Sequence, residues 1–242
     1  KNSCQSPCTS QYRGGRPDSI RELFEERRES MAVQLLDEWL LNEQEQIRKK
    51  YQELNRISVK DPDVLFLGDS IVEYFPLHEL LKTSKTLINR GIRGYRSDLL
   101  LEHLVSLLFG QAVDKVFLLI GTNDIGKEIP QQETVKNVES IIQTIARNYP
   151  LAEVCLLSVL PVNESPTYKK RVHLRNNQKI QALNHAYQEL ASVYMNVTFV
   201  NVYDDLLDET GQLKEAFTTD GLHLTVAGYQ VLVGYLQNKN LI

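Results

Sequence analysis

The chain has 242 residues, with 27 Lys and Arg against 31 Asp and Glu, a formal net charge of −4. Hydrophobic residues make up 42% and charged residues 24%, which is typical of a chain with a packed core and argues against disorder. The acidic balance argues against a nucleic-acid or anionic-membrane binder, and no run approaches the ~18 consecutive apolar residues of a membrane span.

Residues 1–30 differ in composition from the rest, because their start is polar and rich in Gly, Pro and Ser. They contain no apolar core of ~7–15 residues, so this segment does not read as a secretory signal peptide. Met31 opens an amphipathic segment, and we therefore interpret residues 1–30 as a leader added for expression; a native disordered extension is the alternative. On the first interpretation Cys155 is the one cysteine left, which indicates a reduced protein. Because no signal peptide follows Met31, we expect a cytoplasmic location, with secretion by another route as the alternative.

From residue 31 onward, short apolar runs alternate with longer amphipathic segments. The runs are rich in β-branched residues and lack polar alternation, which predicts strands buried on both faces of a parallel sheet. They cover residues 63–68, 86–91, 115–121, 153–159 and 197–202. Helices are expected at about 31–57, 71–82, 97–110, 131–148, 173–195 and 224–238. The alternation predicts an open α/β sheet in a single domain, 31–242, with its core at 60–238.

A serine follows the first apolar run, in the sequence Gly68-Asp69-Ser70. In open α/β sheets, ligands bind beyond the carboxyl ends of the strands, so residues in this position are candidates for chemistry. A serine at a strand-to-helix turn presents its hydroxyl at the sheet edge, and its backbone N–H lies at a helix N-terminus. Taken alone, however, Asp-Ser here is more typical of an ordinary helix N-cap.

Two further motifs follow the second and third apolar runs. In the segment 89–95, Gly91 and Gly94 allow close backbone approach to a ligand with exposed N–H groups, although a plain turn has the same pattern. After the third run, the amide of Asn123 can donate a hydrogen bond to developing negative charge. An Asx-turn that closes the strand is the alternative for Asn123.

Near the C-terminus, Asp220 and His223 are three residues apart and can meet within one turn. The carboxylate can then hold the imidazole Nδ1–H and direct Nε2 outward. No HxxxH, HxH or CxxC element accompanies them, so the sequence does not predict a metal site. Together the four motifs supply a nucleophile, oxyanion donors, a base and its orienting carboxylate, all at element ends that share one rim of the sheet.

This set of motifs resembles the SGNH/GDSL hydrolase superfamily over about residues 60–238. Gly68-Asp69-Ser70, Gly94, the GTND sequence at 121–124 and the DGLH sequence at 220–223 are similar in order and spacing to its conserved blocks. Within it, VLFLGDSIVEYF and NRGIRGYRSDLLLEHL most resemble platelet-activating-factor acetylhydrolase catalytic subunits and their bacterial GDSL-lipase relatives. The resemblance implies a flavodoxin-like three-layer sandwich with a five-stranded parallel sheet.

The resemblance also implies a role for each site residue. Ser70 is the expected nucleophile, His223 the general base and Asp220 its orienting carboxylate. The backbone N–H groups of Ser70 and Gly94 and the side chain of Asn123 form the expected oxyanion hole. Asp69 is expected to support the nucleophile turn, and neither a metal nor an organic cofactor is required.

The sequence departs from the commonest family pattern beside two of these residues. Ile71 follows Ser70 where leucine is usual, and Arg93 precedes Gly94 where small residues are frequent. Arg93 and Arg96 are therefore candidate pocket residues that narrow the site or contact an anionic substrate, with solvated surface charges as the alternative. We expect the loop 161–172 to influence substrate selectivity.

The predicted function is that of a serine esterase acting on a small-molecule ester with a short acyl group, such as an O-acetylated carbohydrate or a lipid-like ester. A thioesterase is one alternative, because its tetrahedral chemistry is the same. A non-catalytic flavodoxin-like module for a nucleotide or flavin is another, but the loop after the first strand offers a single hydroxyl followed by bulky residues. The resemblance also implies a homodimer, for which the leading helix around Trp39 is a candidate surface; the same helix can instead cover the sheet.

Overall fold

The computed structural model describes residues 20–58 and 60–242, with side chains from residue 34 onward. Residues 1–19, most of the expected leader, lie outside the described residues. The chain divides into two compact units, 1–42 and 43–242, and every candidate site residue belongs to the second. Helix α1 (Ile20–Ile57) crosses the boundary, so the helix expected at 31–57 begins earlier in the chain than its amphipathic pattern indicated. In the described part, none of the helices is long and apolar enough to cross a membrane.

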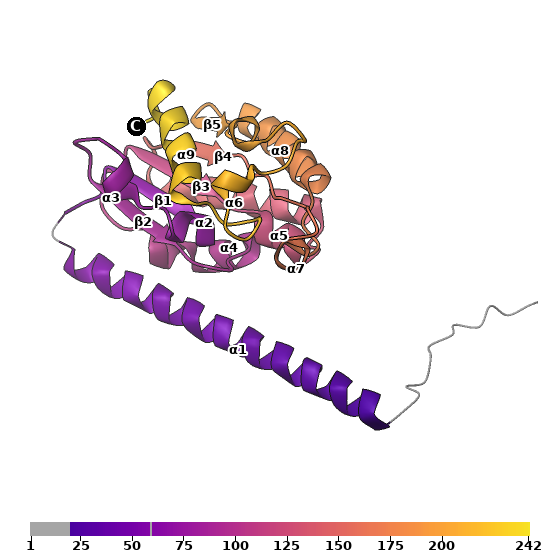
Figure 1. The fold of residues 1–242 in the computed structure, drawn as a ribbon. Helices are drawn as coiled ribbons and strands as arrows, with labels where there is room; N and C mark the ends of the chain where they lie inside the picture. The colour runs from indigo at the N-terminus through magenta and orange to yellow at the C-terminus, as the bar shows by residue number, and fades with distance from the viewer. Residues whose placement is uncertain (1–19, 59) are drawn as a thin grey trace, which may run out of the picture. The chain divides into compact units, whose positions relative to one another are not determined.

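Five parallel strands form a single sheet in the order β2-β1-β3-β4-β5 (Figure 1). Their bounds are β1 (Val64–Gly68), β2 (Leu87–Gly91), β3 (Lys115–Leu119), β4 (Glu153–Leu157) and β5 (Val197–Val200). The chain moves outward from β1 to β2 and then returns to place β3 on the other side of β1. In doubly wound sheets, ligands bind at such a reversal of strand order, beyond the carboxyl ends of the strands, which here are β1 and β3. The α/β fold with a five-stranded parallel sheet is confirmed.

Side chains of β1 alternate between two hydrophobic cores, one on each face of the sheet. Leu65 and Leu67 enter the first core, whereas Val64 and Phe66 enter the second. The first is covered by α4 (Ser97–Leu107), α6 (Gln131–Asn148) and α8 (Asn177–Ser192). The second is covered by α2 (Ser70–Glu73), α3 (Leu77–Leu80) and α9 (Val226–Asn238). The two cores hold the sheet rigid and so fix the positions of its carboxyl ends.

Three expectations about the elements are wrong. The helix expected at 71–82 is split into α2 and α3, because Pro76 has no backbone N–H to continue a helix. The helix expected at 173–195 begins only at Asn177, where the Asn176 side chain accepts a hydrogen bond from Lys179 N at 2.8 Å. Strand β5 is not buried on both faces, since it lies at the sheet edge and exposes Thr198.

Short elements follow β3 and precede α8, and the apolar periodicity did not indicate them. They are α5 (Thr122–Gly126), which contains Asn123 of the GTND motif, and α7 (Lys169–Val172), within the loop 161–172. Two 3-10 turns, η1 (Asp204–Leu206) and η2 (Glu215–Phe217), lead to the last motif. Each of these elements is five residues or shorter, too short to show a helical period.

The C-terminal part of α1, from residue 43, is anchored to the end of β2 and the loop that follows it. Tyr51 is buried, and its hydroxyl donates to the backbone oxygen of Gly91 at 2.9 Å. Two helical turns earlier, Gln44 Nε2 donates to the backbone oxygen of Arg93, also at 2.9 Å. This segment of α1 therefore braces the loop 92–96, which carries the second motif.

Candidate active site

Ser70 is the first residue of α2, directly beyond the carboxyl end of β1. The preceding Gly68 cannot carry a side chain, because a Cβ would lie 2.1 Å from a backbone oxygen of β3. Asp69 caps α2 by accepting a hydrogen bond from Ile71 N at 2.9 Å. Tyr229 of α9 donates its hydroxyl to the backbone oxygen of Ile71 at 2.7 Å. These contacts hold the nucleophile turn against β3 and α9.

Asp69 is fully buried beside the nucleophile, and its contacts agree with the supporting role expected for it. Burial raises the pKa of Asp69 to about 7, although the backbone N–H of Ile71 and the charge of Arg175 act in the opposite direction. Among the residues that the structure describes, its second oxygen, Oδ2, has no hydrogen-bond partner. The carboxyl therefore points into protein rather than toward the space where a substrate would bind.

His223 connects the nucleophile to a carboxylate, as the sequence predicted. Its Nε2 lies 2.9 Å from Ser70 Oγ, and its Nδ1 lies 2.7 Å from Asp220 Oδ2. An ionised carboxylate can only accept hydrogen bonds, so Nδ1 carries the proton and Nε2 is left to accept the serine proton. Ser70 is 6% exposed, so little of the residue is open to solvent.

Asp220 is held ionised by the turn that it shares with His223. Burial alone would raise its pKa, but the backbone N–H and the side chain of His223, together with Leu222 N, lower it to about 2. Asp220 Oδ1 accepts both backbone N–H groups, at 2.8 Å from His223 and 3.1 Å from Leu222. Arg171 of α7 also donates to Asp220 Oδ2 at 2.9 Å, which brings the loop 161–172 to the rim of the site.

Gly94 has the left-handed backbone angle that a side chain disfavours, with φ 72°. Its N–H belongs to the same peptide group as the backbone oxygen of Arg93. That oxygen accepts the hydrogen bond from Gln44, whose side chain is only 5% exposed. The predicted oxyanion donor is thus fixed through the other end of its own peptide group.

Asn123 lies in α5, beyond the carboxyl end of β3, and its amide is bonded on both sides. Nδ2 donates to the backbone oxygen of Tyr95 at 2.9 Å, and Oδ1 accepts from Arg175 Nη2 at 2.9 Å. The neighbouring Asp124 is buried and accepts from the backbone N–H and the hydroxyl of Ser97, which anchors the start of α4. The third motif therefore combines one partly exposed amide with one structural carboxylate.

Arg93 and Arg96 follow β2 near the second motif, but each guanidinium is paired with a carboxylate. Arg93 forms an ion pair with Glu73, and Arg96 with Asp98 at 2.8 Å. Arg93 also lies over the ring of Tyr74, with 5.5 Å from Cζ to the ring centroid. These carboxylates offset both charges, so neither arginine is a free solvated cation. A role for either in substrate contact stays a prediction.

Sequence reasoning missed three side chains that contact the catalytic groups. Arg175 bonds the side chain of Asn123, and Gln44 bonds the Arg93 oxygen in the peptide group that carries the Gly94 N–H. The ring of Tyr74 lies 5.5 Å, centroid to centroid, from that of His223. Tyr74 was open to prediction, since it is one helical turn from Ser70. No local pattern marks Gln44 or Arg175, which reach the site from distant parts of the chain.

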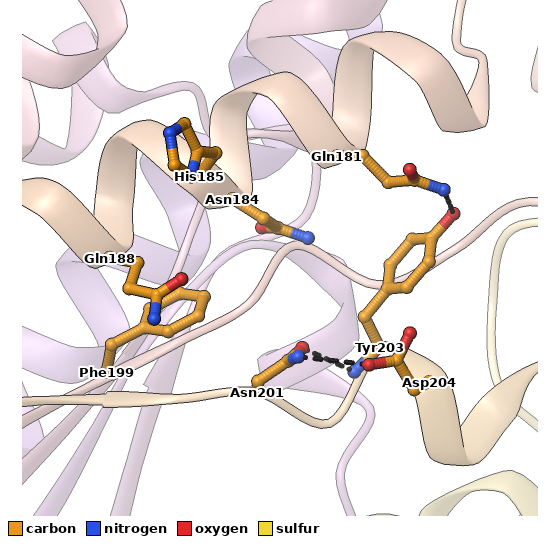
Figure 2. A pocket seen from close by; sticks show the side chains of 8 residues that line it. All are labelled: Gln181, Asn184, His185, Gln188, Phe199, Asn201, Tyr203 and Asp204. Carbon is orange, nitrogen blue, oxygen red and sulfur yellow. Dashed lines mark hydrogen bonds between the residues drawn. The ribbon is translucent and has the colours of Figure 1, made fainter.

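In the described part of the chain, no group of three or more His, Cys, Asp or Glu side chains could hold a metal ion. A polar pocket of about 240 Å³ lies between α8 and the end of β5 (Figure 2). Its lining includes none of the catalytic groups, and Figure 2 shows Gln181 bonded to the hydroxyl of Tyr203 across it. This pocket is therefore separate from the relay of Ser70, His223 and Asp220.

Comparison with known proteins agrees with this geometry. A model of the GDSL-like lipase/acylhydrolase family matches residues 66–231, a range that includes Ser70, Asn123 and His223. The chain belongs to this family. This GDSL-like acylhydrolase is accordingly an ester hydrolase, and the resemblance found in the motifs is confirmed.

The relatives of this acylhydrolase include mammalian and bacterial proteins. Platelet-activating factor acetylhydrolase IB subunit alpha2 of Rattus norvegicus is 29% identical over 174 residues, which cover 70% of this chain and 72% of the relative. A solved protein of Streptococcus pneumoniae, provisionally named a platelet activating factor, is 61% identical with a TM-score of 0.85, over 87% of this chain and 98% of the other. A GDSL-like lipase of Bacteroides thetaiotaomicron is 27% identical with a TM-score of 0.66, over 81% and 98%.

Proposed function

We propose that this acylhydrolase cleaves esters of short acyl groups, acetyl above all, through an acyl-enzyme on Ser70. The observation that carries the mechanism is the relay from Ser70 Oγ to His223 Nε2 at 2.9 Å and from His223 Nδ1 to Asp220 Oδ2 at 2.7 Å. The acetyl preference is supported by the name of the sequence relatives, platelet-activating factor acetylhydrolases. An O-acetylated carbohydrate or a lipid-like acetyl ester is the substrate class that we propose.

Acylation begins when Ser70 Oγ attacks the ester carbonyl carbon and His223 Nε2 takes the hydroxyl proton. The carbonyl π electrons move to oxygen and give a tetrahedral anion. When this intermediate collapses, the C–O bond to the alcohol breaks, and His223 passes its proton to the departing alcohol. Water then repeats the sequence on the acyl-enzyme and releases the carboxylic acid, which returns Ser70 to its starting state.

Asp220 supports both proton transfers without taking a proton itself. Because its pKa is lowered to about 2, it stays ionised at neutral pH and stabilises the imidazolium of His223 in each tetrahedral intermediate. The same hydrogen bond at Nδ1 keeps Nε2 directed at Ser70. The carboxylate thus contributes both orientation and charge.

The tetrahedral anion needs donors that are in place before the charge develops. We assign this role to the backbone N–H groups of Ser70 and Gly94 and to the amide of Asn123. Each such donor contributes on the order of 10²–10³ in kcat in comparable oxyanion holes. The bracing of the Gly94 peptide by Gln44 supports the assignment, because a preorganised donor costs no reorganisation during the reaction.

The non-catalytic nucleotide- or flavin-binding alternative is wrong for a member of a hydrolase family. The thioesterase alternative shares every step above, since a thiol leaves in place of the alcohol. It is therefore separated from esterase activity only by comparing an acetyl ester with an acetyl thioester.

An ester panel tests the proposal. We would measure kcat/KM for p-nitrophenyl esters from acetate to decanoate, an acetylated sugar and an acetyl thioester. Acetate should rank first among the acyl lengths, and Ser70→Ala should lose several orders of magnitude in kcat. Ser192→Ala is the matched control, because this serine is exposed and bonds only a local backbone oxygen. Wild-type activity in Ser70→Ala would overturn the mechanism, whereas a preference for decanoate would overturn the acyl assignment alone.

A further inference from the structure

Arg175 lies between α7 and α8, and the guanidinium of this half-buried residue bonds two residues of the GTND motif, Thr122 and Asn123. Nε donates to the backbone oxygen of Thr122 at 3.0 Å, and Nη2 donates to Asn123 Oδ1 at 2.9 Å. The group lies flat against Gly126, where a Cβ would be only 2.5 Å from the arginine Cζ. The absence of a side chain at Gly126 therefore makes room for the guanidinium beside α5.

The two bonds of the Asn123 amide determine which way it faces. A guanidinium has only donors, so Arg175 can bond the amide only through its oxygen, which must therefore lie on the side of Arg175. The backbone oxygen of Tyr95 is only an acceptor, so it requires the amide nitrogen on the opposite side, where Nδ2 lies at 2.9 Å. Within the described residues this bond uses one proton of Nδ2, which leaves the second for an oxyanion.

The orientation of the Asn123 amide matters because a flipped amide would repel, rather than stabilise, the negative charge on the reacting carbonyl oxygen. With Oδ1 turned toward the reacting carbonyl, Asn123 would place an acceptor against a developing negative charge. A cation bonded to Oδ1 also draws electron density from the amide and strengthens its N–H as a donor. The orientation depends on the donor from Arg175 and the polarisation on its charge, and neither requires Arg175 to touch the substrate.

We propose that Arg175 is a positioning residue of the oxyanion hole, which acts through Asn123 by fixing the orientation of its amide and polarising its N–H. The inference rests on the proposed function, because it requires Asn123 to bind the tetrahedral anion. Since the anion exists only in the transition state and intermediate, the contribution of Arg175 belongs in kcat and not in KM.

A double-mutant cycle tests this coupling, with p-nitrophenyl acetate as the substrate and thermal unfolding recorded for every variant. Asn123→Ala should lower kcat on the order of 10²–10³. Arg175→Met should lower kcat about tenfold, the scale of one charge-assisted hydrogen bond, with KM within about twofold of wild type. In the Asn123→Ala background the same change should cost less than about twofold, because the amide that it positions is gone. Arg147→Met, at an exposed arginine of α6, is the matched control and should keep wild-type kinetics.

The outcomes separate the inference from the function on which it rests. If the losses from Arg175→Met and Asn123→Ala multiply, Arg175 acts independently of the amide and the inference is overturned while the oxyanion assignment stands. If Asn123→Ala retains wild-type kcat, the oxyanion assignment fails and the inference with it.

A second variant keeps the test available should Arg175→Met not fold. Gly126→Ala retains the arginine but forces its guanidinium to move, and it should lower kcat in the wild-type background and not in Asn123→Ala. Unchanged kcat in a folded Gly126→Ala variant would overturn the inference.

Discussion

Gln44 offers a sharp test of how the oxyanion hole is built, because it touches no substrate. Its buried amide donates to the backbone oxygen of Arg93 at 2.9 Å, and that oxygen shares a peptide group with the N–H of Gly94. Gln44→Met keeps nearly the same side-chain volume but removes the donor. The variant therefore isolates one hydrogen bond to the group that is proposed to bind the anion.

The expected magnitude follows from that single bond. A neutral hydrogen bond contributes about 1 kcal/mol net, so the free energy of unfolding should fall by about 1 kcal/mol. For a chain of this size that corresponds to a decrease in Tm of about 2–4 °C. If the transition state must restore the same orientation of the Gly94 N–H, kcat falls about fivefold while KM is unchanged. This is well below the ~10²–10³ that complete loss of an oxyanion donor costs.

Steady-state hydrolysis of p-nitrophenyl acetate and a thermal melt measure both effects on the same samples. Gln46→Met is the matched control, since Gln46 is exposed on the same helix. A Gln44→Met variant with a lowered Tm and wild-type kcat would refute the reasoning, because the amide would then stabilise the fold without orienting the donor. An unchanged Tm together with an unchanged kcat would contradict the hydrogen bond itself.

Three further predictions concern groups around the nucleophile. Asp220→Asn should lower kcat on the order of 10⁴ with the fold intact, because an amide does not hold the required tautomer of His223; a loss under tenfold in steady-state kinetics would contradict this. Burial raises the pKa of Asp69 to about 7 from 3.8, so an unfolded chain releases this proton first and stability falls as pH rises from about 4 to 7. Urea denaturation should therefore show the free energy of unfolding of Asp69→Asn rising relative to that of wild type, by up to roughly 4 kcal/mol, as the pH is raised from 4.5 to 8. The same difference in unfolding free energy at pH 4.5 and at pH 8 would count against the raised pKa. Burial also raises the pKa of the Cys155 thiol to about 12, so iodoacetamide at pH 8 should alkylate Cys155 only in urea; a modified Cys155 peptide from folded protein would refute its inert character.

The strands could be predicted from sequence because buried parallel strands are local apolar runs. The order of the strands is set by long-range pairing, so the exposure of Thr198 at the β5 edge was not predictable from its run. The break after α2 was a missed signal, since Pro76 is visible in the sequence and cannot continue a helix. The strands and the helix break could therefore be predicted from local sequence, whereas the position of each strand in the sheet could not.

The candidate site divides in the same way. Ser70, Asp220 and His223 were predicted because each lies in a short motif at an element end, and the structure brings them into one relay. Gln44 and Arg175 were not, because they reach their partners across 49 and 52 residues of sequence and belong to no motif. The reacting groups lie in short sequence motifs, whereas Gln44 and Arg175, which hold the oxyanion donors, are identified only in the folded chain.

Covalent labelling at Ser70 tests the central claim most directly. A fluorophosphonate reacts with an activated serine, so intact mass should show one adduct per chain, and peptide mapping should place it on Ser70. His223→Ala should abolish the labelling, because the hydroxyl then has no base. A stoichiometric adduct on another residue, or undiminished labelling of Ser70 in His223→Ala, would contradict the account.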